Sequence, residues 1–156
     1  MKIKSLLVLL TLGLSACTGS KYAGVPKQYQ ELISQSMQTA GSNAKELKKA
    51  LKQTPTTQRE GMAFLISYMP ERDAKALTAD FLLENVDYAY KARAEFPWAK
   101  EVPNDIFLND VVAYVNLNEK RENWRKDFYE RFKKYVANCK TMREAIDSVN
   151  KNVRDE

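Results

Sequence analysis

The sequence predicts an all-α protein, an irregular bundle of about six or seven helices. Three observations support this fold class. Apolar residues recur at the helical period of three to four residues in almost every segment. No segment alternates apolar and polar residues over the length of a strand. The 156 residues include only five glycines and five prolines, whereas a sheet protein with many turns draws heavily on both.

The N-terminus has the pattern of a bacterial lipoprotein signal peptide. Two lysines precede an apolar run over residues 6–14, which leads into Leu14-Ser15-Ala16-Cys17. A positive region, a short apolar region and small residues before a cleavage site are typical of secretion signals. The run is too short to cross a bilayer, which takes about 20 residues. Because the last four residues resemble a lipobox, we expect residues 1–16 to be removed and Cys17 to carry lipid; an ordinary signal peptide followed by a chance cysteine is the alternative.

Small and turn-forming residues over 17–26 suit a flexible tether, which leaves residues 27–156 as a single helical domain. Thr18 stands where an Asp would resemble an inner-membrane retention signal, and no acidic cluster resembling a surface-export signal follows. We therefore expect a lipid-anchored protein of the cell envelope, at the outer membrane and facing the periplasm, with Cys17 as its contact to the membrane.

The first half of the domain shows three short helical patterns. The first stops at Gly41. The next two follow Asn43 and Thr57, each of which has a glutamate three residues later, the spacing of a capping box. Pro55 and Pro70 end these two helices, since proline cannot continue a helix.

The second half begins with a longer predicted helix over residues 78–95. Phe96-Pro97-Trp98 should end it and place two aromatic rings near each other, and Pro103 introduces the next helix. Residues 119–136 form the clearest amphipathic pattern, and a third capping box at Thr141 introduces the last helix. The apolar side of the pattern over 119–136 consists of Trp124, Phe128, Phe132, Tyr135 and Val136.

Composition limits the possible functions. The net charge of +5 falls to +3 without residues 1–16, which is too weak and dispersed for a nucleic-acid protein. The sequence contains no histidine, and its acidic residues lack the spacing of a metal-binding loop. We therefore expect no nucleic-acid partner, no metal and no cofactor.

Cys139 is the only cysteine left once Cys17 is lipidated. A catalytic thiol needs a base to ionise it, and no histidine is present, so we expect Cys139 to be structural and the chain to have no catalytic residue. An alternative is a glycan-cleaving enzyme with paired carboxylates, for which the candidates are Glu84, Glu95, Glu101, Asp105 and Asp110. Solvated helix faces explain these acids more simply.

Two further groups are open to two interpretations. Trp98 and Trp124 could stack on a sugar or peptide, although aromatic residues at helical spacing are more often core. Basic residues of the last third could touch anionic lipid headgroups or simply face solvent. These are Lys120, Arg121, Lys133 and Lys134.

Ordered blocks of the chain resemble the N-terminal region of transglutaminase-like proteins of Bacteroides-type bacteria. The blocks are residues 59–66, 69–73, 80–86, 90–93, 96–100, 106–111, 124–129 and 139–141. The resemblance covers roughly residues 45–153. In that family a helical region precedes a papain-like core with a catalytic Cys, His and Asp, and no position here matches those three.

The resemblance therefore implies a non-catalytic, membrane-anchored part of such a protein, in a truncated or accessory form. Its partner would be a transglutaminase-like core or another envelope protein. The alternative is a self-sufficient envelope lipoprotein that binds a protein or a glycan through its aromatic faces.

Overall fold

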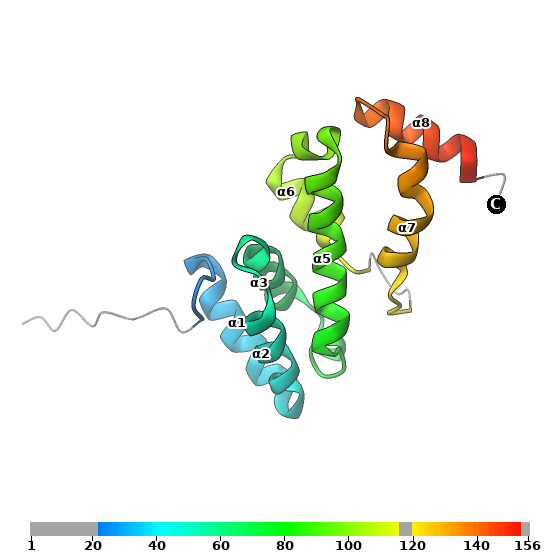
Figure 1. The fold of residues 1–156 in the computed structure, drawn as a ribbon. Helices are drawn as coiled ribbons and strands as arrows, with labels where there is room; N and C mark the ends of the chain where they lie inside the picture. The colour runs from blue at the N-terminus through cyan, green and yellow to red at the C-terminus, as the bar shows by residue number, and fades with distance from the viewer. Residues whose placement is uncertain (1–21, 116–119, 154–156) are drawn as a thin grey trace, which may run out of the picture.

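The computed structural model describes residues 22–115 and 120–153 (Figure 1). These residues are helical and contain no strand, which confirms the predicted all-α fold of about six or seven helices. None of the described helices is long and apolar enough to cross a membrane. The signal peptide and residues 17–21 of the tether, Cys17 included, lie outside the described residues, so their roles remain predictions.

The elements follow one another with short connections. The first half contains α1 (Lys27–Ala40), α2 (Ala44–Gln53), α3 (Arg59–Tyr68), the single turn α4 (Glu71–Ala74) and α5 (Ala79–Glu95). The 3₁₀ turns η1 (Gly41–Asn43) and η2 (Thr56–Gln58) precede α2 and α3. The second half contains η3 (Pro97–Glu101), α6 (Asn104–Ile106), the π-helix η4 (Phe107–Val112), α7 (Trp124–Val136) and α8 (Met142–Asn152).

Several predicted boundaries are confirmed by the backbone. Helix α1 stops where Gly41 takes a φ of +54°, a left-handed conformation that glycine adopts without a steric penalty. Helix α5 begins after Thr78, whose hydroxyl accepts a hydrogen bond from the Phe81 N–H at 3.2 Å. The Thr141 hydroxyl accepts from the Glu144 N–H at 3.2 Å in the same way. These side chains satisfy backbone donors that a helix start leaves unpaired.

The two capping boxes predicted at Asn43 and Thr57 are wrong. Neither residue caps a helix; the Asn43 amide instead donates to the carbonyls of Ala74 and Leu77, both at 2.9 Å. Glu46 accepts from the Ala79 N–H at 3.0 Å. Asn43 thus binds the connection from α4 to α5, and Glu46 binds the first residue of α5, because tertiary packing brings these backbone groups within reach of both side chains.

Residues 22–115 form a body around α5. Helices α1, α2 and α3 lie on one side of α5 in Figure 1, and α7 and α8 lie on the other. The core of the body is a continuous apolar cluster to which α1, α2, α3, α4, α5 and η4 each contribute a buried residue. Its fully buried large side chains include Ile33, Leu47, Met62, Ile66, Leu82, Val86, Phe107 and Val112.

Helices α7 and α8 form a hairpin (residues 124–152) with a much smaller cluster of its own. Five buried residues make up this cluster, and two of them, Phe96 and Ala99, belong to η3 and the residue before it. The helix predicted over 119–136 begins only at Trp124, which corrects its N-terminal bound. Residues 120–123 are not helical, and the side chain of Arg121 in this segment binds Asp73 of α4.

Candidate functional site

Two polar clusters hold the hairpin to the body, and we call them together the polar latch (Asp73, Asn85, Tyr114, Arg121 and Arg125). In the first cluster the Asp73 carboxylate, only 2% exposed, accepts the Tyr114 hydroxyl at 3.0 Å. It also accepts two hydrogen bonds from Arg121, one from Nε at 3.0 Å and one from Nη2 at 2.7 Å. The side chain of Arg121 is 12% exposed and that of Asp73 is 3% exposed, so water has little access to this ion pair.

The protonation states in this cluster follow from burial and charge. Burial favours the neutral form of Asp73, but the hydrogen bonds from Arg121 and Tyr114 outweigh it and lower the pKa of the carboxyl. Burial, reinforced by the nearby charge of Asp73, raises the pKa of Tyr114. Asp73 is therefore an anion and Tyr114 a neutral donor at neutral pH.

The second cluster joins α7 to α5 and to the end of η4. Arg125 donates to Asn85 Oδ1 at 2.8 Å and to the Ala113 carbonyl at 2.7 Å. Asn85 in turn donates to the Val112 carbonyl at 2.7 Å. Burial lowers the pKa of Arg125 to about 10, so the guanidinium stays charged at neutral pH. These bonds fix how α7 is rotated about its own axis.

That rotation leaves four rings of α7 outside the buried cluster of the body. Trp124, Phe128, Phe132 and Tyr135 form an aromatic ladder with successive centroid distances of 5.3, 5.4 and 6.4 Å. Phe128 is 48% exposed and Trp124 36%. The residues of α7 that are buried are Tyr129 and Val136. The expectation that Trp124 belongs to the core is therefore wrong: its ring is partly exposed at the groove, and its indole N–H donates to the Tyr114 carbonyl at 3.1 Å.

An open groove of about 260 Å³ lies between α5, the η3 region, α7 and α8, and we call it the hairpin groove. Trp98 lines it, half-buried, and its ring stacks on that of Phe96 at 5.3 Å with an interplanar angle of 6°, which confirms the expected proximity. The other lining residues are Tyr88, Ala89, Ala92, Val111, Trp124, Arg125, Phe128, Tyr129, Phe132, Lys133, Val136 and Val149.

Helix α8 adds an exposed apolar stripe next to the groove. Met142, Ile146 and Val153 recur at helical spacing and are 38%, 51% and 48% exposed. Val149, on the same stripe, is half-buried and lines the groove. Exposed apolar side chains that stand alone are ordinary, but a contiguous set around a groove marks an interaction surface.

The hairpin and the body differ in charge. Residues 120–153 carry ten Lys and Arg against five Asp and Glu, a net charge of +5, whereas residues 22–115 carry eleven against twelve. Several of the cations flank the aromatic ladder. The guanidinium of Arg125 lies 4.5 Å from the Trp124 ring, and the Lys134 ammonium lies 4.6 Å from the Tyr135 ring. The groove therefore has a largely apolar lining in which the charged residues are the cations Arg125 and Lys133.

The five candidate carboxylates do not gather into a site. Glu95, Glu101, Asp105 and Asp110 are exposed and Glu84 is half-buried. Glu95 accepts a hydrogen bond from the Tyr129 hydroxyl, which gives it a structural contact. Among the described residues no group of three or more Cys, Asp or Glu is arranged to hold a metal ion.

The basic residues that were candidates for contact with lipid headgroups differ in their contacts. Arg121 belongs to the polar latch, which corrects its interpretation as a surface charge, and Lys120 pairs with Glu122. Lys133 lines the groove. Cys139 is half-buried beside the hairpin cluster, with its thiol 3.7 Å from the Tyr135 carbonyl.

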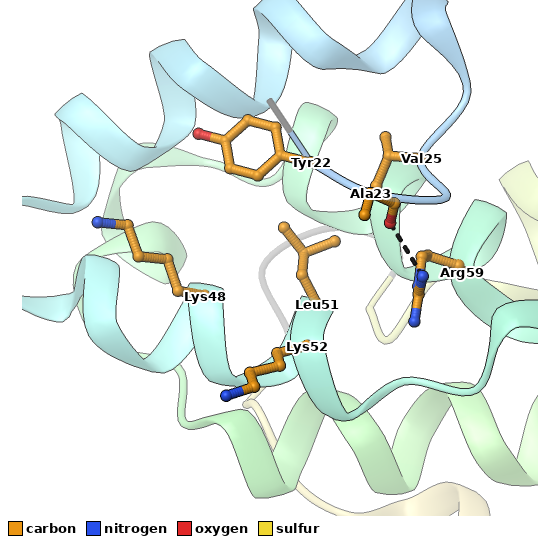
Figure 2. A pocket seen from close by; sticks show the side chains of 7 residues that line it. All are labelled: Tyr22, Ala23, Val25, Lys48, Leu51, Lys52 and Arg59. Carbon is orange, nitrogen blue, oxygen red and sulfur yellow. Dashed lines mark hydrogen bonds between the residues drawn. The ribbon is translucent and has the colours of Figure 1, made fainter. Parts of the chain in front are cut away.

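A second pocket, also about 260 Å³, lies where the described chain begins, and we call it the tether pocket. Figure 2 shows Tyr22 and Ala23 of this segment above Leu51, with Lys48 and Lys52 of α2 at its edge. Arg59 donates to the carbonyls of Ala23 at 2.9 Å and Thr54 at 3.2 Å.

Gly24 permits this arrangement, because it has a φ of +72° and a Cβ there would lie 2.5 Å from Arg59 Nη1. The segment before α1 is thereby fixed against the body. Neither pocket could be read from the sequence. The sequence feature that best points to the hairpin groove is the apolar pattern of α7, because its apolar side is wider than one neighbouring helix can bury.

Searches with protein-family models, among curated proteins and among solved structures find no significant match to the chain.

Proposed function

We propose that this chain is a lipid-anchored, non-catalytic helical module of the cell envelope that binds a partner protein in the hairpin groove. The proposal combines the lipobox-like sequence at Cys17 with one structural observation, the exposed apolar surface of α7 and α8 around a groove. A transglutaminase-like core, in keeping with the sequence resemblance, or another envelope protein would be the partner.

The chemistry of the groove defines what the partner presents. Its floor consists of aromatic and aliphatic side chains, which fit apolar anchors of a protein surface. Its lining includes the cations Arg125 and Lys133, and residues 120–153 carry a net charge of +5, which attracts acidic residues and speeds association. We therefore propose an amphipathic segment with apolar anchors and acidic flanks as the occupant.

A glycan fits this groove less well. Sugar binding requires hydrogen-bonding groups beside the aromatic rings, and two tyrosine hydroxyls at the groove are already engaged. Tyr88 donates to Glu130 at 3.3 Å, and Tyr129 donates to Glu95. The Trp98 indole N–H at the groove is a buried donor for which the described residues provide no partner, but one donor is little for recognising the many hydroxyls of a sugar.

Site-specific photo-crosslinking tests the binding function. A photoreactive amino acid in place of Phe128 should give a discrete protein adduct in intact envelopes, and mass spectrometry should identify an acidic surface in the partner. The same group in place of exposed Gln38 on α1 is the control. No adduct from position 128, or equal adducts from both positions, would contradict the proposal.

The anchor has its own experiment. Cys17→Ala should abolish metabolic labelling with palmitate and release the protein from membranes, because no acyl chain can then be attached. Cys139→Ala is the matched control and should leave labelling unchanged. Membrane retention of the Cys17→Ala variant at the wild-type level would refute the anchor.

A further inference from the structure

We infer that the lysine face of α2 (Lys45, Lys48, Lys49 and Lys52) lies against an anionic lipid surface and orients the module so that the hairpin groove points away from the membrane. The four residues follow the spacing i, i+3, i+4 and i+7, so they share one side of the helix. All four are exposed, and Leu47, Ala50 and Leu51 are buried on the opposite side.

The lysine face carries an excess of positive charge. Among the described ion pairs, Lys49 binds Asp80 at 2.9 Å, and none involves the other three lysines. Glu46, the acid on the same helix, already accepts the Ala79 N–H. An anionic bilayer attracts such lysines, since each one near the surface strengthens binding about fivefold.

The position of this face relative to Cys17 identifies a membrane as the occupant. Tyr22 and Ala23 line the tether pocket together with Lys48 and Lys52 (Figure 2). Arg59 fixes that segment by its bond to the Ala23 carbonyl. Tyr22 follows Cys17 by five residues, a span of about 18 Å at most, so a lipid at Cys17 would hold the lysine face close to the headgroups.

The hairpin is more basic than α2, but it lies on the far side of α5 from α1 and α2 (Figure 1). The same short tether would therefore keep it from the bilayer that holds Cys17. This orientation rests on the proposed anchor, whereas attraction of the lysine face to anionic lipid does not require it.

Lysine footprinting on vesicles tests the inference. The lipidated protein is reconstituted in phosphatidylcholine alone, or in equal parts of phosphatidylcholine and phosphatidylglycerol, and the acetylation rate of each lysine is measured by mass spectrometry. Anionic vesicles should slow the modification of Lys48 and Lys52 several-fold and leave Lys140 and Lys151 of the hairpin segment unchanged. Slower modification of Lys133 and Lys134 instead would overturn the orientation.

A second arm separates this inference from the anchor. A Cys17→Ser chain that begins at residue 17 contains every described helix, and it should bind the anionic vesicles in a salt-sensitive manner. The double variant Lys48→Gln/Lys52→Gln should lower its partition coefficient about 25-fold, while Lys140→Gln/Lys151→Gln, with the same charge change, should have little effect.

Equal effects of the two double variants, or no binding to anionic vesicles, would overturn the inference. Protection of Lys48 and Lys52 in intact envelopes but not on protein-free vesicles would also overturn it, because the face would then bind an acidic protein. Loss of the lipidated protein from pure phosphatidylcholine vesicles would instead count against the anchor.

Discussion

The body and the hairpin are built on different principles, although both consist of amphipathic helices. The body encloses a large apolar cluster with many fully buried side chains, such as Ile33 and Leu82. The hairpin buries only a few residues and is held by the polar latch. The body thus buries most of its apolar side chains on folding, whereas several large apolar side chains of the hairpin remain exposed. The difference supports the proposal that the hairpin binds a partner.

The largest expected effect is on the latch. Asp73→Ala should destabilise the protein by about 3–5 kcal/mol, because it removes the buried carboxylate that accepts hydrogen bonds from Arg121 and Tyr114. Denaturant unfolding measures the change. Asp80→Ala, which removes the exposed partner of Lys49, is the control and should cost about 1 kcal/mol or less. Similar losses in both variants would show that the latch does not hold the hairpin.

The two apolar clusters should respond unequally to truncation. Leu82 is fully buried in the body. Leu82→Ala should lower the free energy of unfolding by about 2–5 kcal/mol, because it leaves a cavity in a closed core. Val136→Ala in the hairpin should cost about 1–2 kcal/mol, since fewer methyl groups are lost and the site opens onto the groove. Denaturant unfolding of both variants checks the ranking, and an equal or larger loss at Val136 would contradict it.

Acid should weaken the latch before the apolar core. The pKa of Asp73 lies below its ordinary value of 3.8 in the folded protein, so its contribution to stability is complete above that value. The contribution is lost as the pH falls through the lowered folded-state pKa. Unfolding free energies measured across this range should fall less steeply for Asp73→Asn than for wild type. If the free energy of unfolding depends on pH in the same way in the variant and in wild type, Asp73 is not the group responsible for the loss of stability in acid.

The cap of α8 should have a smaller effect. Thr141→Ala should cost about 1 kcal/mol, because the Glu144 N–H loses its acceptor. Thr39→Ala, at an exposed position inside α1, is the matched control and should change stability by less than about 0.5 kcal/mol. Thermal unfolding compares the two, and equal changes would mean that the cap does not stabilise the hairpin.

The sequence predicts the helices well because their signals are local. The apolar period, Gly41 after α1 and the Thr141 cap depend on neighbouring residues, and the structure confirms them. Asn43 has the same local signal as a cap, but its amide binds carbonyls more than 30 residues away. A pattern of nearest neighbours cannot reveal such a competing partner.

The hairpin groove could not be predicted for the same reason. In the sequence, Phe128 and Val136 belong to one apolar side of α7, yet one is exposed and the other buried. Which part of a wide apolar face is covered depends on the contact of Arg125 with Asn85, 40 positions earlier in the chain. Lipidation at Cys17 depends only on local sequence, so it could be predicted, and it stays a prediction.

The stability of a double variant, Phe128→Ser/Ile146→Ser, tests most directly whether the exposed apolar surface of the hairpin is dispensable for folding. Both side chains are about half exposed, so if the surface serves a partner, their removal should lower the free energy of unfolding by only about 1 kcal/mol. Denaturant unfolding measures this value beside that of Leu82→Ala. A loss as large as that of Leu82→Ala would show that these residues belong to the core and would contradict the account.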